Sequence, residues 1–446
     1  MRLTGGERTA LIYGLAGIIG KSAGLAIIPL LALFLSLDEV GRWAELTVLR
    51  ILSAAVGTAC LDAWLTQRFH KQEDSVRQAF AAGCVLLAWR WSLIVALPGV
   101  LIAGLAAADL IAAHWLLWGL VGAASALGGA STVGLSLLRI TEKPKIFAVL
   151  NGLVGAVSVA LCWGTVAAAG WGLWGVAAGT LLPWVGASVW FAWTCRGGQA
   201  SWTDASGFTW RTMPSRLLSE VSTQVDRLVL GIFVSDRALG LYDLALRTAG
   251  AVGMVQGSLK NTLMPTCLRR LAEGKPIAAT LRQGGLALLA AGFAVVAGGV
   301  VLAQLRPEWR ESAVFLPGAV AVQCWWFAGA ANGIASYHAG LVRLQAFLPL
   351  VTLPLITAGM AVGLASGGIW GGQWLLVAGT AAGVLVTERA IRRSRPDLPG
   401  NAWLFLEMGI ASALLLGLSL LPWWAGCGAA LVSSAIAGGW YVLRRR

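Results

Sequence analysis

Hydrophobic runs long enough to cross a membrane recur from one end of this sequence to the other, and only short polar stretches separate them. A helix of about 20 apolar residues spans a bilayer core about 30 Å thick. Of the 446 residues, 58% are hydrophobic and 12% are charged, whereas roughly a quarter of the residues in a soluble domain are charged. The sequence therefore predicts an all-α polytopic membrane protein, and it leaves no segment for a large soluble catalytic domain.

We predict about fourteen transmembrane helices, arranged as two pseudo-symmetric six-helix bundles and two C-terminal helices. The first run is too long for a cleaved signal peptide, so we expect it to be a membrane helix. The expected spans are 10–36, 43–66, 79–105, 113–138, 146–169, 172–194, 216–235, 240–264, 284–305, 313–338, 345–366, 372–388, 402–421 and 426–443.

Lysine and arginine residues gather in every second connection between these spans. With the N-terminus in the cytoplasm, the cytoplasmic segments hold 23 of the 33 Lys and Arg residues, and the outside loops hold four. Cytoplasmic loops of membrane proteins carry such an excess of cations. The pattern predicts that both termini are cytoplasmic, and it explains the net charge of +13 without nucleic acid as a partner.

The seven cysteines are scattered singly, mostly within apolar runs. This spacing fits neither a disulfide framework nor a zinc site. We therefore predict no metal site and no cofactor.

Charged residues also lie inside the predicted spans, most densely in the stretch 216–247. Four polar residues of this stretch have the spacing of a single helical face: Arg216, Glu220, Gln224 and Arg227. A charge at the bilayer centre costs about 2.5–3.5 kcal/mol on insertion scales, so this face should line a hydrated interior rather than lipid.

Nine charges in all are predicted to lie within spans: Lys21, Arg50, Asp62, Arg90, Glu220, Asp226, Arg227, Arg247 and Lys260. They either surround a hydrated cavity or pair internally. The internal pairs that we consider are Asp226 with Lys21 or Arg247, and Asp62 with Lys260 as a structural or gating pair. For Arg90 we favour a structural role.

The chain contains an internal repeat. The segment LALFLSLDEVGRW (31–43) aligns without gaps on LGIFVSDRALGLY (230–242). An acid and then an arginine follow each copy, first Glu45 and Arg50 and then Asp243 and Arg247. Such parallel repeats are typical of transporters whose sites lie between the two halves. We predict an N-terminal lobe (1–200), a cytoplasmic link (201–215), a C-terminal lobe (216–395) and helices 13 and 14 (396–446).

Three segments resemble the polysaccharide-transport and O-antigen flippase family of the multidrug, oligosaccharidyl-lipid and polysaccharide exporter superfamily. They are LSLDEVGRWAEL (35–46), QVDRLVLGIFVSDRALGLYDLALR (224–247) and RITEKPKIFAVLNGL (139–153). The sequence departs from the family pattern at Trp43, where Tyr is common, and at Gln224, where Asn is frequent.

The resemblance implies a protein of the bacterial inner membrane that moves an undecaprenyl-pyrophosphate-linked oligosaccharide from the cytoplasmic to the periplasmic leaflet. The glycan would be a repeat unit of O-antigen, capsule or exopolysaccharide. It also implies a cationic central cavity and alternating access. The polymerase and glycosyltransferases of the same pathway are possible partners, with H⁺ or Na⁺ as a possible coupling ion.

Arginine offers bidentate contacts to phosphate, and lysine offers a point charge. The residues that we expect to contact the pyrophosphate are Lys21, Arg50, Arg227, Arg247 and Lys260. The residues that we expect to act in gating, ion pairing or coupling are Asp62, Glu220, Gln224 and Asp226.

Three other functions remain open from the residues alone. An ion-coupled drug or small-molecule antiporter of the same superfamily would need an acid-rich cavity. A polytopic glycan polymerase or ligase would need a sizeable outside loop with catalytic groups, and the predicted outside loops are short. A scaffold subunit would carry its charges without using them. We therefore expect a transporter rather than an enzyme.

The predicted topology has a direct test. A green fluorescent protein fused after Arg446 should fluoresce, because that protein folds in the cytoplasm. Alkaline phosphatase fused at the same residue should be inactive, and the same enzyme inserted after Arg42, in the first predicted outside loop, should be active. The reverse pattern would overturn the orientation.

Overall fold

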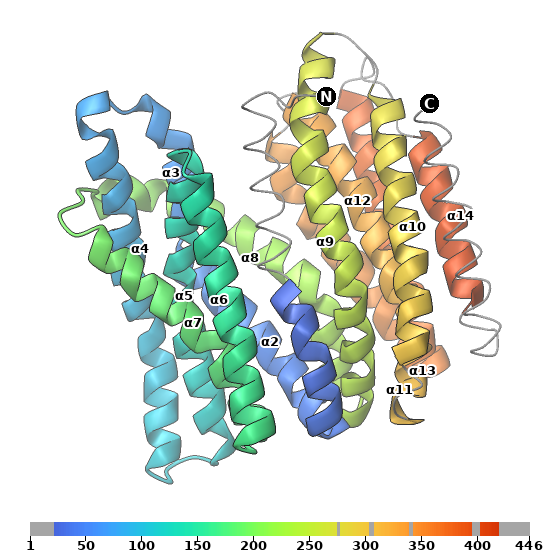
Figure 1. The fold of residues 1–446 in the computed structure, drawn as a ribbon. Coiled ribbons are helices and arrows are strands. Elements are labelled where there is room, and N and C mark those ends of the chain that lie inside the picture. Colours follow the sequence, from blue (N-terminus) through green and yellow to red (C-terminus); the bar gives the residue numbers. More distant parts are fainter. Residues whose placement is uncertain (1–21, 274–276, 303–306, 339–341, 395–401, 419–446) are drawn as a thin grey trace. The chain divides into compact units, whose positions relative to one another are not determined.

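The computed structural model is built from α-helices, and its residues 22–273, 277–302, 307–338, 342–394 and 402–418 are described here (Figure 1). No strand occurs within these ranges. The chain divides into two compact units, Met1–Gln224 and Val225–Arg446. The division falls within one long helix, α8 (Trp202–Phe233).

Unit 1 begins, within the described residues, with the short apolar helix Ser22–Phe34. The helices that follow are α2 (Leu37–Thr58), α3 (Leu61–Arg68), α4 (Asp74–Ala107), α5 (His114–Ile140), α6 (Pro144–Trp163) and α7 (Gly172–Thr194). A short 3₁₀ turn, η1 (Phe69–Lys71), follows α3, and a π-helical turn, η2 (Gly164–Ala168), extends α6.

The described residues of unit 2 form the end of α8 and the helices α9 (Asp236–Ala272), α10 (Ala278–Leu302), α11 (Pro307–Ala313), α12 (Leu316–His338), α13 (Val342–Ser394) and α14 (Ala402–Leu418). Helix α13 bends at Gly367 and Gly368, whose backbone angles are not helical. This break separates the predicted spans 345–366 and 372–388.

Eight helical segments of the described residues are long and apolar enough to cross a membrane. Two shorter apolar helices, Ser22–Phe34 and Leu404–Leu415, add to them. These segments confirm the multi-pass, all-helical class. The number fourteen and the overall pseudo-symmetry stay predictions, since the predicted span 426–443 and the start of 10–36 lie outside the described residues.

The polar helices α8 and α9 differ from the predicted spans in their length. We predicted a link at 201–215, but this segment is helical and continuous with the predicted span 216–235, so that α8 runs through both. Helix α9 likewise extends beyond the predicted 240–264 at both ends. A helix satisfies its own backbone hydrogen bonds, so it continues across polar sequence at a membrane surface without loss.

The two copies of the repeat have the same local structure. In each copy a helix ends at a phenylalanine, at Phe34 in the first and at Phe233 in the second. A serine then caps the next helix: Ser36 Oγ accepts from Glu39 N at 3.3 Å, and Ser235 Oγ accepts from Ala238 N at 3.4 Å. The aligned serines thus supply the same helix-starting interaction.

Unit 1 is held together by close approach of helix backbones at glycines. A Cβ atom added to Gly57 on α2 would lie 2.3 Å from the carbonyl oxygen of Ala126 on α5. A Cβ on Gly99 of α4 would lie 2.6 Å from the carbonyl oxygen of Gly119 on α5. Small residues permit this approach, which drives helix association in membranes because lipid tails are as apolar as the side chains.

The predicted span 43–66 is broken within unit 1. Ala59 and Cys60 have φ values of 51° and 55°, so α2 ends at Thr58 and α3 starts at Leu61. Two side chains bond to carbonyl oxygens at the break: Thr209 Oγ1 to Ala59 at 2.9 Å and Trp91 Nε1 to Val56 at 2.9 Å. These contacts supply partners for groups that a continuous helix would satisfy itself.

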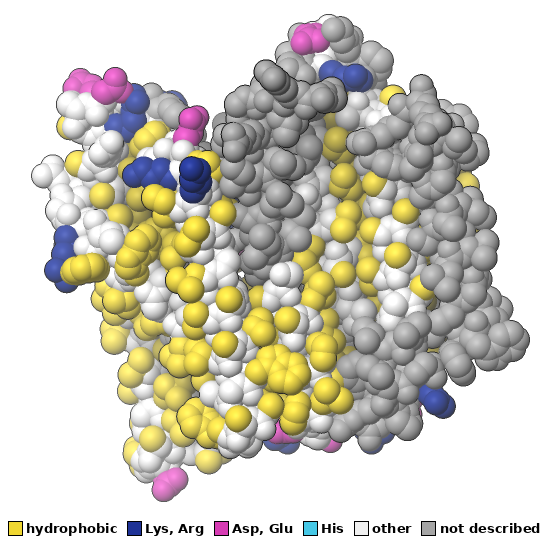
Figure 2. All heavy atoms as spheres, in the orientation of Figure 1, with side chains coloured by type: hydrophobic (Ala, Val, Ile, Leu, Met, Phe, Trp, Pro, Cys, Tyr) yellow, Lys and Arg dark blue, Asp and Glu magenta, His cyan; other side chains and the backbone are white. Residues whose placement is uncertain are grey.

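The surface of unit 1 is divided by chemistry. On the face drawn in Figure 2, Lys and Arg side chains gather toward one end, and hydrophobic side chains cover the flank below them. Exposed cations of the predicted cytoplasmic connections include Lys71, Lys143, Lys145 and Arg196. The arrangement of exposed groups agrees with a membrane-embedded flank.

We predict that Gly57→Ala destabilises the protein by about 1–3 kcal/mol, because the added methyl group forces the backbones of α2 and α5 apart. Gly104→Ala on α4 is the matched control, since a Cβ there meets nothing within 4 Å. Thermal unfolding of the purified protein in detergent measures both. Equal melting temperatures for the two variants would contradict the close packing.

Candidate functional site: a buried aspartate and arginine cluster

Helices α8 and α9 form a hairpin around the second copy of the repeat, and polar side chains of this hairpin are buried in unit 2. Asp226 and Arg227 lie near the end of α8, and Tyr242, Asp243 and Arg247 lie in the first part of α9. Asp243 and Tyr242 are 0% exposed, and Asp226 and Arg227 are 7% and 8% exposed. These groups have therefore left water and need partners within the protein.

Asp243 contacts both arginines. Its Oδ1 accepts a hydrogen bond from Arg227 Nε at 2.8 Å, and its Oδ2 accepts one from Arg247 Nε at 2.5 Å. The first pair joins α8 to α9, and the second joins positions i and i+4 of α9. One carboxylate therefore fixes two guanidinium groups, each of which has five N–H donors.

Asp226 accepts hydrogen bonds from Tyr242 and from the backbone of Arg227. Its Oδ2 accepts from the Tyr242 hydroxyl at 2.9 Å, and its Oδ1 accepts from the backbone N–H of Arg227 at 2.8 Å. The Tyr242 ring packs edge-on against Phe315, with 6.2 Å between ring centroids. Asp226 and Tyr242 thus hold the α8 and α9 backbones in one register beside the arginines.

The four formal charges of this cluster cancel when all four groups are ionised. Pairing offsets the free-energy cost of burying these charges, whereas a buried charge that loses its partner strongly destabilises the fold. The arginines are the groups suited to an anionic ligand, since a phosphate oxygen can take the place of a carboxylate oxygen on a guanidinium group.

A second group of charges lies in unit 1. Arg216 of α8 pairs with Glu220 one turn later, at 3.0 Å between Nε and Oε1. Its NH1 lies 3.6 Å from Asp62 Oδ2 on α3. The side chain of Arg216 is 38% exposed, so this group is more open to solvent than the cluster around Asp243. It brings together three of the residues that the sequence singled out.

The remaining predicted site residues are distributed as follows. Arg50 lies half-buried on α2, and Gln224 is buried on α8, where its Nε2 donates to Thr223 Oγ1 at 3.3 Å. Lys260 belongs to α9, but its side chain lies outside the described residues, as does all of Lys21. Arg90 is exposed on α4. The predicted convergence of these cations on one cavity stays a prediction.

Asp243 and Tyr242 were not among the predicted site residues. The sequence did contain a signal for Asp243, which lies four residues before Arg247 and follows the repeat as Glu45 does. Its second partner, Arg227, is on a different helix, and spacing along one helix does not reveal a pair across a hairpin. The pairs considered for Asp226 did not include Tyr242.

The sequence matches a family model described as polysaccharide biosynthesis protein over residues 8–269, which include the cluster around Asp243. The match covers more than half of the chain. The chain belongs to the polysaccharide biosynthesis protein family.

Solved structures of a flippase and of MATE transporters share this fold. The lipid II flippase MurJ, in an inward closed conformation, matches with a TM-score of 0.62 and 11% identity, covering 98% of this chain and 99% of that one. A mutant of the Vibrio cholerae MATE transporter VcmN matches with a TM-score of 0.56 and 15% identity, over 90% and 98%.

A MATE transporter in a straight conformation matches with a TM-score of 0.57 and 15% identity, over 91% of this chain and 96% of that one. At these identities the likeness establishes the fold alone. No curated protein matches the sequence. The three solved structures that resemble this member of the polysaccharide biosynthesis protein family are those of a flippase and of two MATE transporters.

We predict that Asp243→Asn lowers the free energy of unfolding by about 3–5 kcal/mol, because two buried arginines lose their shared carboxylate. The matched control is Asp74→Asn, which removes an exposed carboxylate from its pair with Arg77 and should cost about 1 kcal/mol or less. Denaturation in detergent, followed by tryptophan fluorescence, measures both. A loss no larger than that of the control would show that Asp243 does not hold the cluster.

Proposed function

We propose that this protein is a flippase that moves an undecaprenyl-pyrophosphate-linked oligosaccharide from the cytoplasmic to the periplasmic leaflet of a bacterial inner membrane. The family match, whose description is polysaccharide biosynthesis, and a fold shared over nearly the whole chain with a lipid II flippase support this proposal. The observation that carries it is the pair of arginines that one buried aspartate fixes on helices α8 and α9.

The arginines act as a preformed binding site for the pyrophosphate. In the resting protein the carboxylates of Asp243 and Asp226 together balance the charges of the two guanidinium groups, so that these groups are stable within the membrane. A multivalent pyrophosphate offers more oxygens than one carboxylate does, and it competes with Asp243 for these donors. Asp226 and Tyr242 keep Arg227 in place during this exchange. The other cations of this proposal are Lys21, Arg50 and Lys260.

The second group of charges has a role in the same cycle. Arg216 of α8 forms two partly exposed ion pairs within unit 1, one with Asp62 of α3 and one with Glu220 of α8 itself. Exposed ion pairs contribute about 0–1 kcal/mol and therefore open easily. We assign Asp62 and Glu220, with Gln224, to gating, where a pair that forms and breaks is useful in alternating access.

The membrane potential provides a driving force. An anionic headgroup that moves outward runs down the inside-negative potential, which contributes about 2.3 kcal/mol per charge per 100 mV. Transport therefore needs no ATP. In this proposal, membrane-bound enzymes assemble the lipid-linked glycan on one side of the membrane, and others polymerise it on the opposite side.

A second candidate function is an ion-coupled antiporter for small molecules, which the fold shared with MATE transporters favours. In that case the Asp226 carboxylate, which is bonded to Tyr242, is the group that H⁺ or Na⁺ would neutralise. An antiporter of this kind would respond to an ion gradient and would transport a cationic drug.

Transport by reconstituted protein decides between these functions. We predict that proteoliposomes with the wild-type protein move the lipid-linked oligosaccharide of the host cell to the outer leaflet, where a periplasmic glycosidase reaches it. Arg247→Ala should slow this transport at least tenfold, because one of the two guanidinium groups is lost. Arg237→Ala, which removes an exposed arginine near the start of the same helix, is the matched control.

Two results would contradict the proposal. One is equal transport by the two variants, and the other is wild-type protein that moves no lipid-linked oligosaccharide but exchanges a cationic dye for H⁺ or Na⁺. An inside-negative potential imposed on the vesicles should raise the rate for outward transport. Indifference to that potential would remove the proposed driving force.

A further inference from the structure

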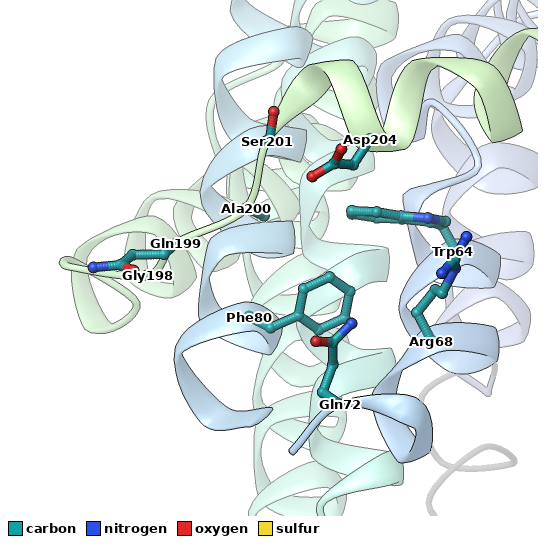
Figure 3. Close-up of a pocket in the computed structure, with 9 residues that line it drawn as sticks. All are labelled: Trp64, Arg68, Gln72, Phe80, Gly198, Gln199, Ala200, Ser201 and Asp204. Carbon is teal, nitrogen blue, oxygen red and sulfur yellow. The ribbon is translucent and has the colours of Figure 1, made fainter. Parts of the chain in front are cut away.

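A polar pocket of about 590 Å³ lies in unit 1 (Figure 3). Three segments surround it: α3 with η1, the start of α4, and the connection from α7 to α8 together with the first turn of α8. Its lining includes the side chains of Trp64, Arg68, Gln72, Phe80 and Asp204. No role in the proposed transport has been assigned to any of them.

The pocket combines an aromatic surface with donors and acceptors. Trp64 and Phe80 pack edge-to-face with 5.1 Å between ring centroids. Figure 3 shows Asp204 above these rings and Gln72 below, with Gln199 directed away from the centre. Arg68 supplies further donors from the side of α3. A ligand that fits here needs an apolar face and several groups that both donate and accept hydrogen bonds.

The charges of the pocket select the kind of ligand. Arg68 and Asp204 line the same space, but within the described residues neither side chain has an ion pair or a hydrogen bond. One cation and one anion give no net attraction for phosphate. A polyhydroxylated ligand uses both, because a hydroxyl group donates to the carboxylate and accepts from the guanidinium group.

The walls of the pocket are fixed to one another. The backbone N–H of Gln199 donates to the carbonyl oxygen of Ala79 at 2.8 Å. A Cβ atom added to Gly198 would lie 2.2 Å from the backbone nitrogen of Gly83, so the connection lies directly on α4. Trp91 of α4 stacks on Trp202 of α8, with 4.8 Å between ring centroids. A preformed pocket loses less entropy when a ligand binds.

We infer that this pocket binds carbohydrate, and that it recognises the sugar units of the lipid-linked oligosaccharide before transport. This second step rests on the proposed function. The distribution of Lys and Arg predicts that Arg68 and the connection from α7 to α8 are cytoplasmic. The proposed substrate is in the cytoplasmic leaflet before transport, so the pocket would be on the same side as the substrate. The pocket volume lies within the range of about 300–1,000 Å³ that is usual for ligand sites.

The binding test uses the full-length protein in nanodiscs and needs no transport. The probe is the free oligosaccharide that mild acid releases from the lipid-linked glycans of the host cell, observed by saturation-transfer NMR. Saturation should reach the sugar protons with wild-type protein. Asp204→Asn should weaken binding about tenfold, as the loss of a hydrogen bond to a charged group does. Phe80→Ala should weaken binding about as much, because the apolar face of the pocket loses its ring.

Arg196→Ala is the control, since it removes an exposed arginine from the same connection without altering the pocket lining. Asp204 is itself exposed, so its variant keeps the test valid if Phe80→Ala does not fold. Equal affinity in wild type, Asp204→Asn and the control would overturn the inference. Binding of uridine monophosphate in place of the oligosaccharide would also overturn it.

The transport test examines the role of the pocket. Proteoliposomes receive undecaprenyl pyrophosphate that carries either one sugar or the complete oligosaccharide. Asp204→Asn should move the one-sugar lipid at the wild-type rate and the complete one about tenfold more slowly. If Asp204→Asn slowed the transport of both lipids equally, recognition of the longer glycan by the pocket would be contradicted. Wild-type protein that moves neither lipid would refute the proposed function, and the NMR result would still decide whether the pocket takes carbohydrate.

Discussion

The bond between Asp243 and its two arginines is the interaction on which the α8–α9 hairpin depends. The two arginines are tolerated in a membrane protein interior because the charges of Asp243 and of the neighbouring Asp226 balance theirs. The consequence is a fixed geometry, since Arg227 on one helix and Arg247 on the other are held by the two oxygens of one carboxylate. The same contact that stabilises the hairpin thus holds two guanidinium groups against one carboxylate, and this is the pair that we propose as the binding site for the pyrophosphate.

Hydrophobic patterning predicted most of the membrane helices, because an apolar run long enough to span a bilayer has few other stable conformations. Helices α4 to α7 lie close to their expected ranges for this reason. Spacing along one helix likewise predicted a shared face for Arg216 and Glu220, which form an ion pair. The family resemblance read from the segments around the repeat is confirmed by the family match.

Contacts across helices could not be predicted in this way. The partner of Asp243 on α8 lies sixteen residues away along the chain, and the pocket beside Trp64 is built from three separate segments. The helical start of α8 at Trp202 was also missed, since its polar composition and Pro214 are typical of a connection. In each case the structure depends on contacts with residues that are distant in sequence, and spacing along one segment does not reveal such contacts.

The break in the helix at Ala59 and Cys60 changes the direction in which the side chains after it point around the helix axis. Each left-handed residue costs about 1–2 kcal/mol for a side chain with a Cβ atom, and it resets the angular phase of the helix. A helical-wheel projection drawn continuously from Arg50 to Asp62 therefore assigns the wrong azimuth to every residue after the joint. Residues of α3 must be oriented from their own axis, as the contact of Asp62 with Arg216 shows.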